Sequence, residues 1–528
     1  MTRWASIFAL AACGHHSSVE PDGAIDPCGG SAACIVTTAG PVQGVVDGAL
    51  WEWRGIPYAA PPIGDLRWRP PQPVTPWTAP LATTTFGSEC MQLDLSTGAS
   101  AGGSEDCLTL NVWRPATIDH PLPVVFFIHG GYYVQGGADI TWHGQLAYDG
   151  ARIAAQGAIV ITAQYRLGAL GFLDDPELAR SGDAHGNYGT LDQIAALQWL
   201  NANAGALGAD PSHVMIVGQS AGGLSVCQLL ASPLARGLFD AAIIESGATC
   251  EAHTTSYASD QASLARTNLG CDGAADVGAC MRAVSASAAA GAIPDAVTGP
   301  HHWGPTIDGT VELASPIDAF TAGNFNAVPV IVGNTSEEMA SQVEYYYATL
   351  PTDAASFEAA LEKLYTVAHA QQIAAQYPIA NYASYAWALT YALTDGLYVC
   401  PGRRVARALS AHAPTWRYVF EHAFDASDFG SGTTSLTTYG AYHFIDVPYE
   451  FVDTMPDDFT FDPSEAALAT QLSAYVVRFA ATGDPNDGPL PSWPAFDTSG
   501  DIHLALDVPV SSHAGYRTSL CDFWDSLD

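Results

Sequence analysis

The chain has 528 residues, of which 48% are hydrophobic, and this content allows a large buried core. It carries 18 Lys and Arg against 54 Asp and Glu, which gives a formal net charge of −36. Proteins that bind nucleic acid need clustered basic side chains to contact phosphate groups, so this charge balance argues against nucleic acid as a partner. The acidic surface is expected to serve solubility, with cationic substrates as the alternative.

The N-terminus has the pattern of a targeting segment. A short apolar run, residues 4–12, leads into Leu10-Ala11-Ala12-Cys13-Gly14, which looks like a bacterial lipobox. We therefore expect residues 1–13 to be a lipoprotein-type signal peptide ending at Cys13, the lipidated residue. Residues 14–34 are polar and rich in Gly and Pro, as in a flexible tether. The apolar run is too short to span a bilayer, so membrane contact is expected only through the lipid. Because the run is also short for a signal peptide, a misassigned start codon is the alternative.

The rest of the chain, residues 35–528, is expected to form one enlarged α/β domain. Residues 35–58 alternate apolar and polar side chains and predict opening antiparallel strands. Continuous apolar runs, typical of strands buried on both faces, follow at 124–128, 159–164, 214–218, 242–245, 328–333 and 416–420. Helical stretches such as 191–203 lie between several of them, which predicts a mostly parallel central sheet with helices on both faces. Residues 340–412 and 464–481 are mainly helical and are expected to form a cap and a rim.

One of these strands runs directly into Gly218-Gln219-Ser220-Ala221-Gly222, and residues 224–230 behind it have helical character. Strand, tight turn and helix around G-x-S-x-G are typical of a nucleophile elbow, which exposes the central hydroxyl. Flanking glycines are needed because the reversal brings backbones too close for Cβ atoms. Ser220 is therefore the candidate nucleophile. Gly is abundant, with 50 residues, so a glycine-rich turn with an idle serine is the alternative.

Other motifs, in the same order, resemble those of the type-B carboxylesterase and cholinesterase family of α/β-hydrolases. They are Arg54-Gly55-Ile56-Pro57-Tyr58-Ala59, Glu105-Asp106-Cys107-Leu108-Thr109-Leu110-Asn111-Val112-Trp113, His129-Gly130-Gly131, Tyr165-Arg166-Leu167-Gly168, Gly186-Asn187-Tyr188-Gly189 and Leu191-Asp192-Gln193. The resemblance extends from about residue 36 to the C-terminus. It implies an α/β-hydrolase fold and a carboxylic ester hydrolase, which needs neither a metal nor a cofactor. No Cys or His cluster has the spacing of zinc ligands.

The resemblance also implies the remaining catalytic groups, in the chain order Ser, acid, His. Residues 334–338 are similar to the acid loop of the family, and Glu338 is the expected acid, with its neighbour Glu337 as the alternative. Residues 441–449 are similar to the histidine loop, and His443 is the expected general base. An imidazole with a pKa near 6.5 suits this role, because it must accept a proton and return it near neutral pH.

The segment His129-Gly130-Gly131-Tyr132 follows a predicted strand and resembles the oxyanion loop of the family. The implied donors are the backbone N–H groups of Gly131, Tyr132 and Ala221. Such donors stabilise the negative oxygen that develops on the attacked carbonyl, and loss of one typically lowers the rate about 100- to 1,000-fold. Plain glycines at the end of a strand are the alternative.

Three departures from the family concern the substrate pocket. Cholinesterases carry an acidic residue before the nucleophile and a tryptophan in the first disulfide loop, whereas this chain has Gln219 and no Trp between residues 90 and 107. Choline esters are therefore not expected as substrates. Trp303 falls where the family forms its acyl pocket, so it either restricts acyl length or packs as a buried side chain. Phe444 replaces a usual glycine beside the histidine, and this departure bears on the shape of that loop.

Eleven cysteines suit an oxidising compartment. The resemblance implies three disulfides, Cys90–Cys107, Cys271–Cys280 and Cys400–Cys521. Cys28 and Cys34 are candidates for a local pair, whereas Cys227 and Cys250 have no obvious partner. Because Cys227 lies on the helix after the elbow, we expect a buried apolar side chain there and no reactive thiol.

Two charged pairs are implied by the resemblance as well, Arg67 with Glu105 and Arg166 with Asp192, both in bracing roles. The expected function is a serine carboxylesterase for uncharged, largely apolar esters, with a small-molecule ester as the partner. A dedicated esterase for a natural-product, feruloyl or toxin ester, and an amidase or carbamate hydrolase, are the alternatives among enzymes. A noncatalytic binding module is disfavoured by the intact Ser220, Glu338 and His443. The sequence does not indicate the oligomeric state.

Overall fold

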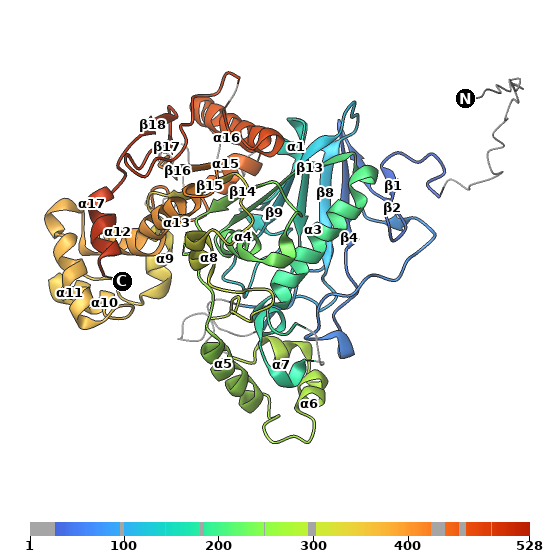
Figure 1. The fold of residues 1–528 in the computed structure, drawn as a ribbon, viewed down its shortest axis with the longest axis horizontal. Helices are drawn as coiled ribbons and strands as arrows, with labels where there is room; N and C mark the ends of the chain where they lie inside the picture. Colours follow the sequence, from blue (N-terminus) through green and yellow to red (C-terminus); the bar gives the residue numbers. More distant parts are fainter. Residues whose placement is uncertain are drawn as a thin grey trace, which may run out of the picture.

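The computed structural model describes residues 27–94, 100–142, 144–179, 184–247, 249–293, 302–423, 439–452, 461–486 and 488–527. Its centre is a twisted sheet of 11 strands, crossed by helices on both sides (Figure 1). In order across the sheet the strands are β18 (Ser511–His513), β17 (His503–Leu506), β16 (Thr415–Phe420), β15 (Val330–Thr335), β14 (Ala241–Glu245), β13 (Ala209–Gln219), β9 (Leu122–Ile128), β12 (Ile159–Ala163), β8 (Thr109–Pro115), β4 (Leu50–Pro57) and β3 (Val45–Asp47). From β17 to β12 neighbouring strands are parallel, and antiparallel strands flank them at both edges.

The central strands are continuously apolar because helices bury both of their faces. In β9, Val124, Phe126 and Ile128 belong to one core layer, whereas Val125 and Phe127 belong to the other. Helices that cover the first face include α3 (Tyr188–Leu207), α4 (Ala221–Ala231), α8 (Pro316–Ala322) and α13 (Cys400–Ser410). Helices that cover the second are α1 (Ala151–Ala155), α15 (Asp446–Phe451) and α16 (Pro463–Thr482). Because helices bury both faces, the sequences of these strands lack the alternating polar side chains of a half-exposed strand.

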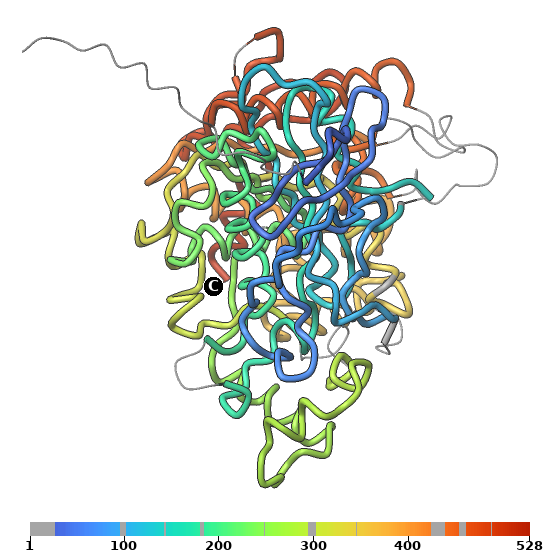
Figure 2. The backbone as a smooth tube through the Cα atoms, turned by 90° about the vertical axis from the view of Figure 1, so that its right-hand side faces the viewer, coloured from blue at the N-terminus to red at the C-terminus, as the bar shows by residue number. Residues whose placement is uncertain are grey.

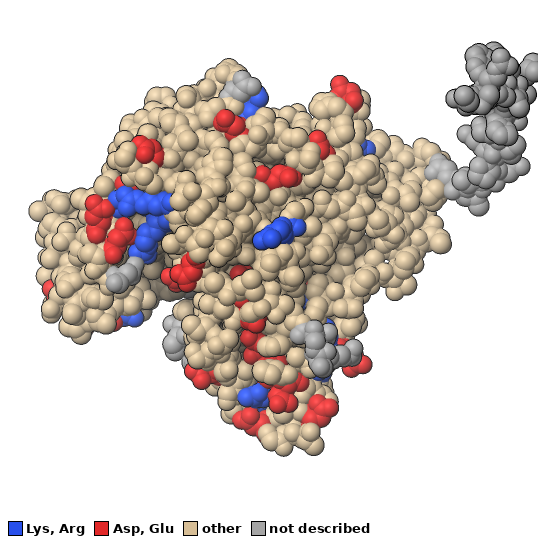
Figure 3. Space-filling view, in the orientation of Figure 1, with Lys and Arg blue, Asp and Glu red and all other residues tan. Residues whose placement is uncertain are grey.

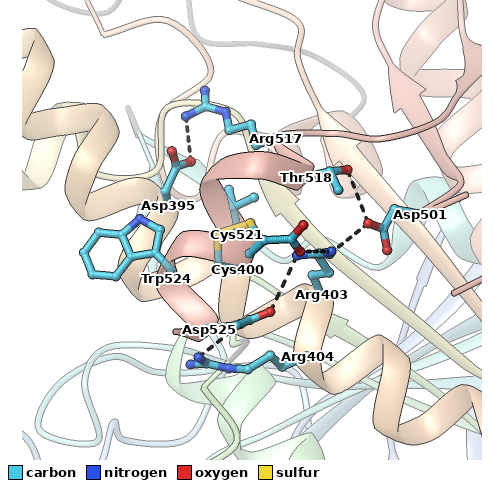
Figure 4. The surroundings of a disulfide bond; sticks show 12 residues. Asp395, Cys400, Arg403, Arg404, Asp501, Arg517, Thr518, Cys521, Trp524 and Asp525 are labelled. Atoms are coloured by element: carbon cyan, nitrogen blue, oxygen red, sulfur yellow. Dashed lines mark hydrogen bonds and ion pairs between the residues drawn. A yellow bond between two sulfur atoms is a disulfide. The ribbon is translucent and has the colours of Figure 1, made fainter. Parts of the chain in front are cut away.

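A helical group packs beside the carboxyl ends of the parallel strands and has its own hydrophobic core. It consists of α9 (Ala340–Tyr346), α10 (Ala354–Leu361), α11 (Val367–Gln376), α12 (Tyr385–Thr394), the π-helical turn Asp395–Val399, the start of α13, and α17 (Thr518–Asp525). The chain is thus helical through most of 340–412, as the sequence predicts. The disulfide Cys400–Cys521 ties α17 to α13, and Arg403 adds ion pairs to Asp501 at 2.9 Å and Asp522 at 2.6 Å (Figure 4).

The remaining helices and strands lie at the periphery. Helices α5 (Thr255–Asn268), α6 (Val277–Ala283) and α7 (Ala286–Ala290) project away from the sheet, at the bottom of Figures 1 and 2. Acidic side chains gather on this projection, whereas basic and acidic groups adjoin near α13 and α17 (Figure 3). The short elements are β1 (Cys34–Val36), β2 (Pro41–Gln43), β5 (Leu81–Ala82), β6 (Gln92–Leu93), β7 (Ser100–Gly102), β10 (Thr141–Trp142), β11 (Gln145–Leu146) and α2 (Gly168–Phe172). No helix within the described ranges has the length and apolarity needed to cross a membrane.

Five disulfides link the described cysteines. Three join the pairs that the family resemblance implies, Cys90–Cys107, Cys271–Cys280 and Cys400–Cys521, and a fourth joins Cys28 to Cys34. The fifth joins Cys227 to Cys250, for which the sequence offers no partner; Cys227 is buried, as expected, and its sulfur is in a disulfide. The two are 23 residues apart and meet only because α4 packs against the chain that follows β14. Five bridges indicate an oxidising compartment; Cys13 lies outside the described residues.

Candidate active site

Ser220 occupies a sharp turn between β13 and α4. Its backbone has φ +60° and ψ −124°, a conformation that non-glycine residues rarely adopt, and its N–H donates to the carbonyl oxygen of Glu245 at 2.9 Å. The neighbouring glycines are required by space. A Cβ atom on Gly218 would lie 2.4 Å from the carbonyl oxygen of Gly222, and one on Gly222 would lie 2.0 Å from that of Ile128. The turn has the geometry that the G-x-S-x-G pattern predicts.

Glu338 and His443 meet behind this turn. Glu338 follows β15 and is fully buried, and one of its carboxylate oxygens accepts a hydrogen bond from the backbone N–H of Thr335 at 2.8 Å. The other carboxylate oxygen lies 2.5 Å from Nδ1 of His443. A second link is the N–H of His443, which donates to the backbone oxygen of Glu338 at 3.2 Å. The alternative acid, Glu337, accepts instead from Tyr391 at 2.9 Å, away from His443.

The other ring nitrogen of His443 contacts Gln219. Nε2 of His443 lies 3.1 Å from the side-chain nitrogen of Gln219. With Nδ1–H donated to Glu338, Nε2 has a free electron pair, so the Gln219 amide donates to it. Between the described Ser220 and His443 the structure contains no hydrogen bond. Gln219, expected in the substrate pocket, therefore competes with Ser220 for the candidate base.

The glycine-rich loop after β9 faces the start of α4. Gly131 and Tyr132 have φ values of +110° and +57°, and the loop is closed by the N–H of Val134, which donates to the carbonyl oxygen of Gly131 at 3.0 Å. The N–H of Ala221 is the first of α4, and an α-helix leaves its first N–H groups without partners inside the helix. A Cβ atom on Gly130 would lie 2.7 Å from the backbone oxygen of Gln219. This approach explains why the loop needs glycine beside the nucleophile turn.

A cavity of about 410 Å³ opens beside Ser220. Its lining includes Tyr132, Tyr346, Leu397 and Tyr398, and also Leu224, Glu251, His253 and Trp303. Burial lowers the pKa of His253 to about 4, which keeps its imidazole neutral near pH 7. Neither Lys nor Arg lines the described part of the cavity. Such a pocket favours uncharged ligands with aromatic or apolar surface.

Of the residues that the sequence places in the substrate pocket, Trp303 lines the cavity and Phe444 does not. Trp303 is buried and lines the cavity with its Nε1–H unpaired. The hydroxyl of Tyr132 donates to the side-chain oxygen of Gln342 at 2.9 Å, and its ring meets Tyr346 edge to face, so the ring forms part of the cavity wall. The ring of Phe444, by contrast, packs on the ring of Tyr148, with 6.2 Å between their centroids, and Phe444 is absent from the cavity lining. Its φ of +86° explains why a glycine is usual there.

The two bracing pairs are both formed. Arg67 makes two hydrogen bonds to the carboxylate of Glu105, at 2.6 and 2.7 Å. Arg166 bonds to both oxygens of Asp192 at 2.7 Å, with each side chain buried. Planar guanidinium groups suit such two-point contacts with carboxylates. Arg166 thereby joins the segment after β12 to α3.

A cluster of three buried carboxyl groups, absent from the sequence-based prediction, lies behind His443. Glu245 ends β14, and Asp446 and Glu450 belong to α15. Burial raises the pKa of Glu450 to about 8 and that of Asp446 to about 6, and it holds the pKa of Glu245 well above its ordinary value. Each neighbouring carboxylate charge acts in the same direction. Tyr418 donates to Asp446 at 2.9 Å. The spacing of Asp446 and Glu450 after His443 places them on one helix face, which is the signal that could have revealed them.

No group of three or more His, Cys, Asp or Glu residues suited to hold a metal ion is present in the described ranges. The most buried histidine near the site is His129, which stacks on Tyr165 and bonds to the carbonyl oxygen of Gly130. Burial lowers its pKa to about 4, so it is neutral and structural.

A parallel sheet with helices on both faces, a nucleophile turn after a central strand and a Glu–His pair beside it define an α/β-hydrolase. The family model described as "Carboxylesterase family" matches residues 31–524, and the chain belongs to this family of carboxylic ester hydrolases. The chain is 33% identical over 499 residues to para-nitrobenzyl esterase of Bacillus subtilis (strain 168), which covers 90% of this chain and 95% of that protein. It is 32% identical over 509 residues to fumonisin B1 esterase of Sphingopyxis macrogoltabida, covering 92% and 88%.

A solved structure of PNB esterase superimposes with a TM-score of 0.77 at 29% identity and covers 94% of this chain and all of that one. The α/β-hydrolase fold expected from the sequence is thereby confirmed, as is the membership of the family. Acetylcholinesterase of Bungarus fasciatus is also similar, at 29% identity over 534 residues, covering 93% of this chain and 86% of that protein. The protein is therefore an enzyme that hydrolyses carboxylic esters.

Proposed function

We propose that the protein is a serine carboxylesterase that hydrolyses uncharged, largely apolar esters through an acyl-enzyme. The observation that carries this proposal is the contact of 2.5 Å between Glu338 and Nδ1 of His443, whose Nε2 contacts Gln219, the residue before Ser220. A buried carboxylate on Nδ1 fixes the tautomer in which Nε2 is the proton acceptor, and it stabilises the imidazolium that forms. Glu338, and not Glu337, is the acid.

In the first half-reaction Ser220 Oγ attacks the ester carbonyl while its proton moves to Nε2 of His443. The N–H groups of Gly131, Tyr132 and Ala221 stabilise the resulting oxyanion. His443 then returns the proton to the departing alcohol, and the acyl group stays on Ser220. Water repeats the sequence on the acyl-enzyme and releases the acid. Because Nε2 accepts from Gln219 in the free enzyme, Gln219 gives way to the Ser220 hydroxyl when the ester binds.

The expected substrate class follows from the lining. A cavity with mainly aromatic and apolar walls and a neutral His253 offers neither Lys nor Arg for an anionic ester. The only carboxylate among its described lining residues, Glu251, is exposed to solvent, and Gln219 beside Ser220 is neutral. Esters with uncharged acyl and alcohol groups therefore fit best. A dedicated esterase for a larger natural-product ester is the second candidate, favoured by the similarity to a protein named fumonisin B1 esterase. We also propose export as a lipoprotein anchored through Cys13.

An active-site probe tests the nucleophile. A fluorophosphonate is expected to label Ser220 alone, and Ser220→Ala is expected to abolish ester turnover while the free energy of unfolding changes by less than about 1 kcal/mol, since no cavity forms. Ser246 provides a matched control, because it lines the same cavity and its hydroxyl has no hydrogen-bond partner. Ser246→Ala should retain labelling and turnover. Ester turnover by Ser220→Ala would refute the proposed mechanism.

A further inference from the structure

One wall of the cavity is covalently tied to the helix that begins at the nucleophile. Cys227 lies in α4, and its sulfur is bonded to that of Cys250 in the segment between β14 and α5. Both cysteines are fully buried. Because α4 starts directly after Ser220, the disulfide fixes the position of this segment relative to the reacting hydroxyl.

The segment around Cys250 faces the cavity on both sides of the bridge. Gly247, Thr249, Glu251 and His253 line the cavity, whereas Cys250 does not and is directed into the core. The backbone of Cys250 has φ +46°, in the left-handed region that residues with a Cβ atom avoid. A conformation of this kind persists only when surrounding contacts impose it. The Cys227–Cys250 disulfide is the covalent one among the contacts that hold Cys250.

Hydrogen bonds extend the anchoring to the neighbouring part of the cavity lining. The side-chain amide of Gln228, next to Cys227 in α4, donates to the carbonyl oxygen of Glu251 at 2.8 Å. The N–H of His253 donates to the carbonyl oxygen of Pro305 at 2.8 Å. Pro305 lies two residues after Trp303, and both line the cavity. The bridge thus restrains the cavity segment that includes Trp303 as well as its own.

We propose that the Cys227–Cys250 disulfide determines acyl selectivity by holding this wall at a fixed distance from Ser220. The inference rests on the proposed function, because it takes Ser220 as the acylated residue. A pocket discriminates between acyl groups by size only as far as its walls resist displacement, since a wall that moves accommodates extra carbon atoms at little cost. An irregular segment without the bridge can move, whereas α4 is held by the sheet and by the nucleophile turn.

The test compares two esters with one leaving group, 4-nitrophenyl acetate and 4-nitrophenyl benzoate, in the oxidised protein. In the parent, kcat/KM is expected to favour the acetate. In Cys227→Ala/Cys250→Ala the benzoate-to-acetate ratio is expected to rise about tenfold, a typical effect of relaxed steric exclusion. The ratio is independent of the fraction of active enzyme, so a purely structural loss of folded protein does not change it. Cys271→Ala/Cys280→Ala is the matched control and should keep the parental ratio.

A ratio within about twofold of the parent in Cys227→Ala/Cys250→Ala would overturn the inference. Should that variant lack a cooperative thermal transition, Cys250→Ala decides in its place, because it breaks the same bridge and leaves the Cys227 side chain in the core. Its ratio is also expected to rise about tenfold, and an unchanged ratio would overturn the inference. A parent that turns over neither ester contradicts the proposed function itself, which separates the two failures.

Discussion

The buried carboxyl cluster lowers the stability of this enzyme as the pH rises, whereas an acid held in a salt bridge raises it. Glu450 has a pKa of about 8 in the folded protein, against about 4.5 for an ordinary glutamate. In the unfolded chain it loses its proton near pH 4.5, whereas the folded protein retains it up to about pH 8. The contribution of Glu450 to stability is therefore fully present below pH 4.5 and is lost as the pH rises through 8.

The size of this effect follows from proton linkage. One proton difference changes the free energy of unfolding by about 1.4 kcal/mol per pH unit, so the loss between pH 5 and pH 8 is about 4 kcal/mol. A domain of about 500 residues has an unfolding entropy near 1 kcal/mol per kelvin, so 1 kcal/mol corresponds to about 1 °C in Tm. In Glu450→Gln the amide stays neutral at every pH and the dependence disappears. The Tm of this variant minus that of the parent is expected to rise by about 4 °C from pH 5 to pH 8.

Thermal unfolding of both proteins, followed by fluorescence at pH 5, 6, 7 and 8, measures this difference. The titrating groups outside the cluster are shared, so their contributions cancel in the comparison. Glu362→Gln is the control for the same substitution outside the cluster, because Glu362 is exposed at the end of α10. A Tm difference for Glu450→Gln that stays constant from pH 5 to pH 8 would show that Glu450 titrates as in water, and the buried-acid interpretation would fail.

Three further predictions concern selectivity and export. Tyr132→Gly should raise kcat/KM for a tert-butyl ester relative to the ethyl ester of the same acid about tenfold, because the ring in the cavity wall is removed; an unmoved ratio would contradict this role. Gln219→Glu should raise kcat/KM for a choline ester relative to the ethyl ester by roughly ten- to a hundredfold, since a charged hydrogen bond contributes about 1.5 to 3 kcal/mol. A parent enzyme that already prefers the choline ester would refute the expected preference for uncharged esters. Cys13→Ser should release the enzyme from membranes or stall its processing, which fractionation detects.

The parallel core of the fold could be predicted because its signal is local. Residues 214–218 form a continuous apolar run, and a strand buried on both faces is the usual reason for such a run. The observed β13 begins earlier, at Ala209, through residues such as Asp210 and Ser212 that carry no apolar signal. Within this extension only Ala209 pairs with β9, at Leu122, and the register shifts between Ala209 and Val214. One pairing across to a neighbouring strand, and not the character of the residues themselves, sets this boundary.

The nucleophile turn could be predicted for the same reason, whereas the cavity walls could not. The turn is one contiguous pentapeptide whose glycines are required by backbone contacts within a few residues. The wall residues Tyr346 and Tyr398 come from α9 and from the π-helical turn before α13, and no spacing in the sequence connects them to Ser220. The partners Cys227 and Cys250 likewise meet only after α4 packs in the fold. Contacts of this kind depend on the tertiary structure.

Backbone conformation around the site shows why local rules fail there. Ser220, Tyr132 and Phe444 all have positive φ, between +57° and +86°, where glycine is the residue that local preference favours. Each is held by a tertiary contact: Ser220 by the carbonyl oxygen of Glu245, Tyr132 by Gln342, and Phe444 by packing on Tyr148. Side chains at these positions provide the proposed nucleophile, a cavity wall and a support for the histidine loop, none of which glycine can supply. The strain is therefore retained where function needs a side chain, and the surrounding fold supplies the energy that stabilises it.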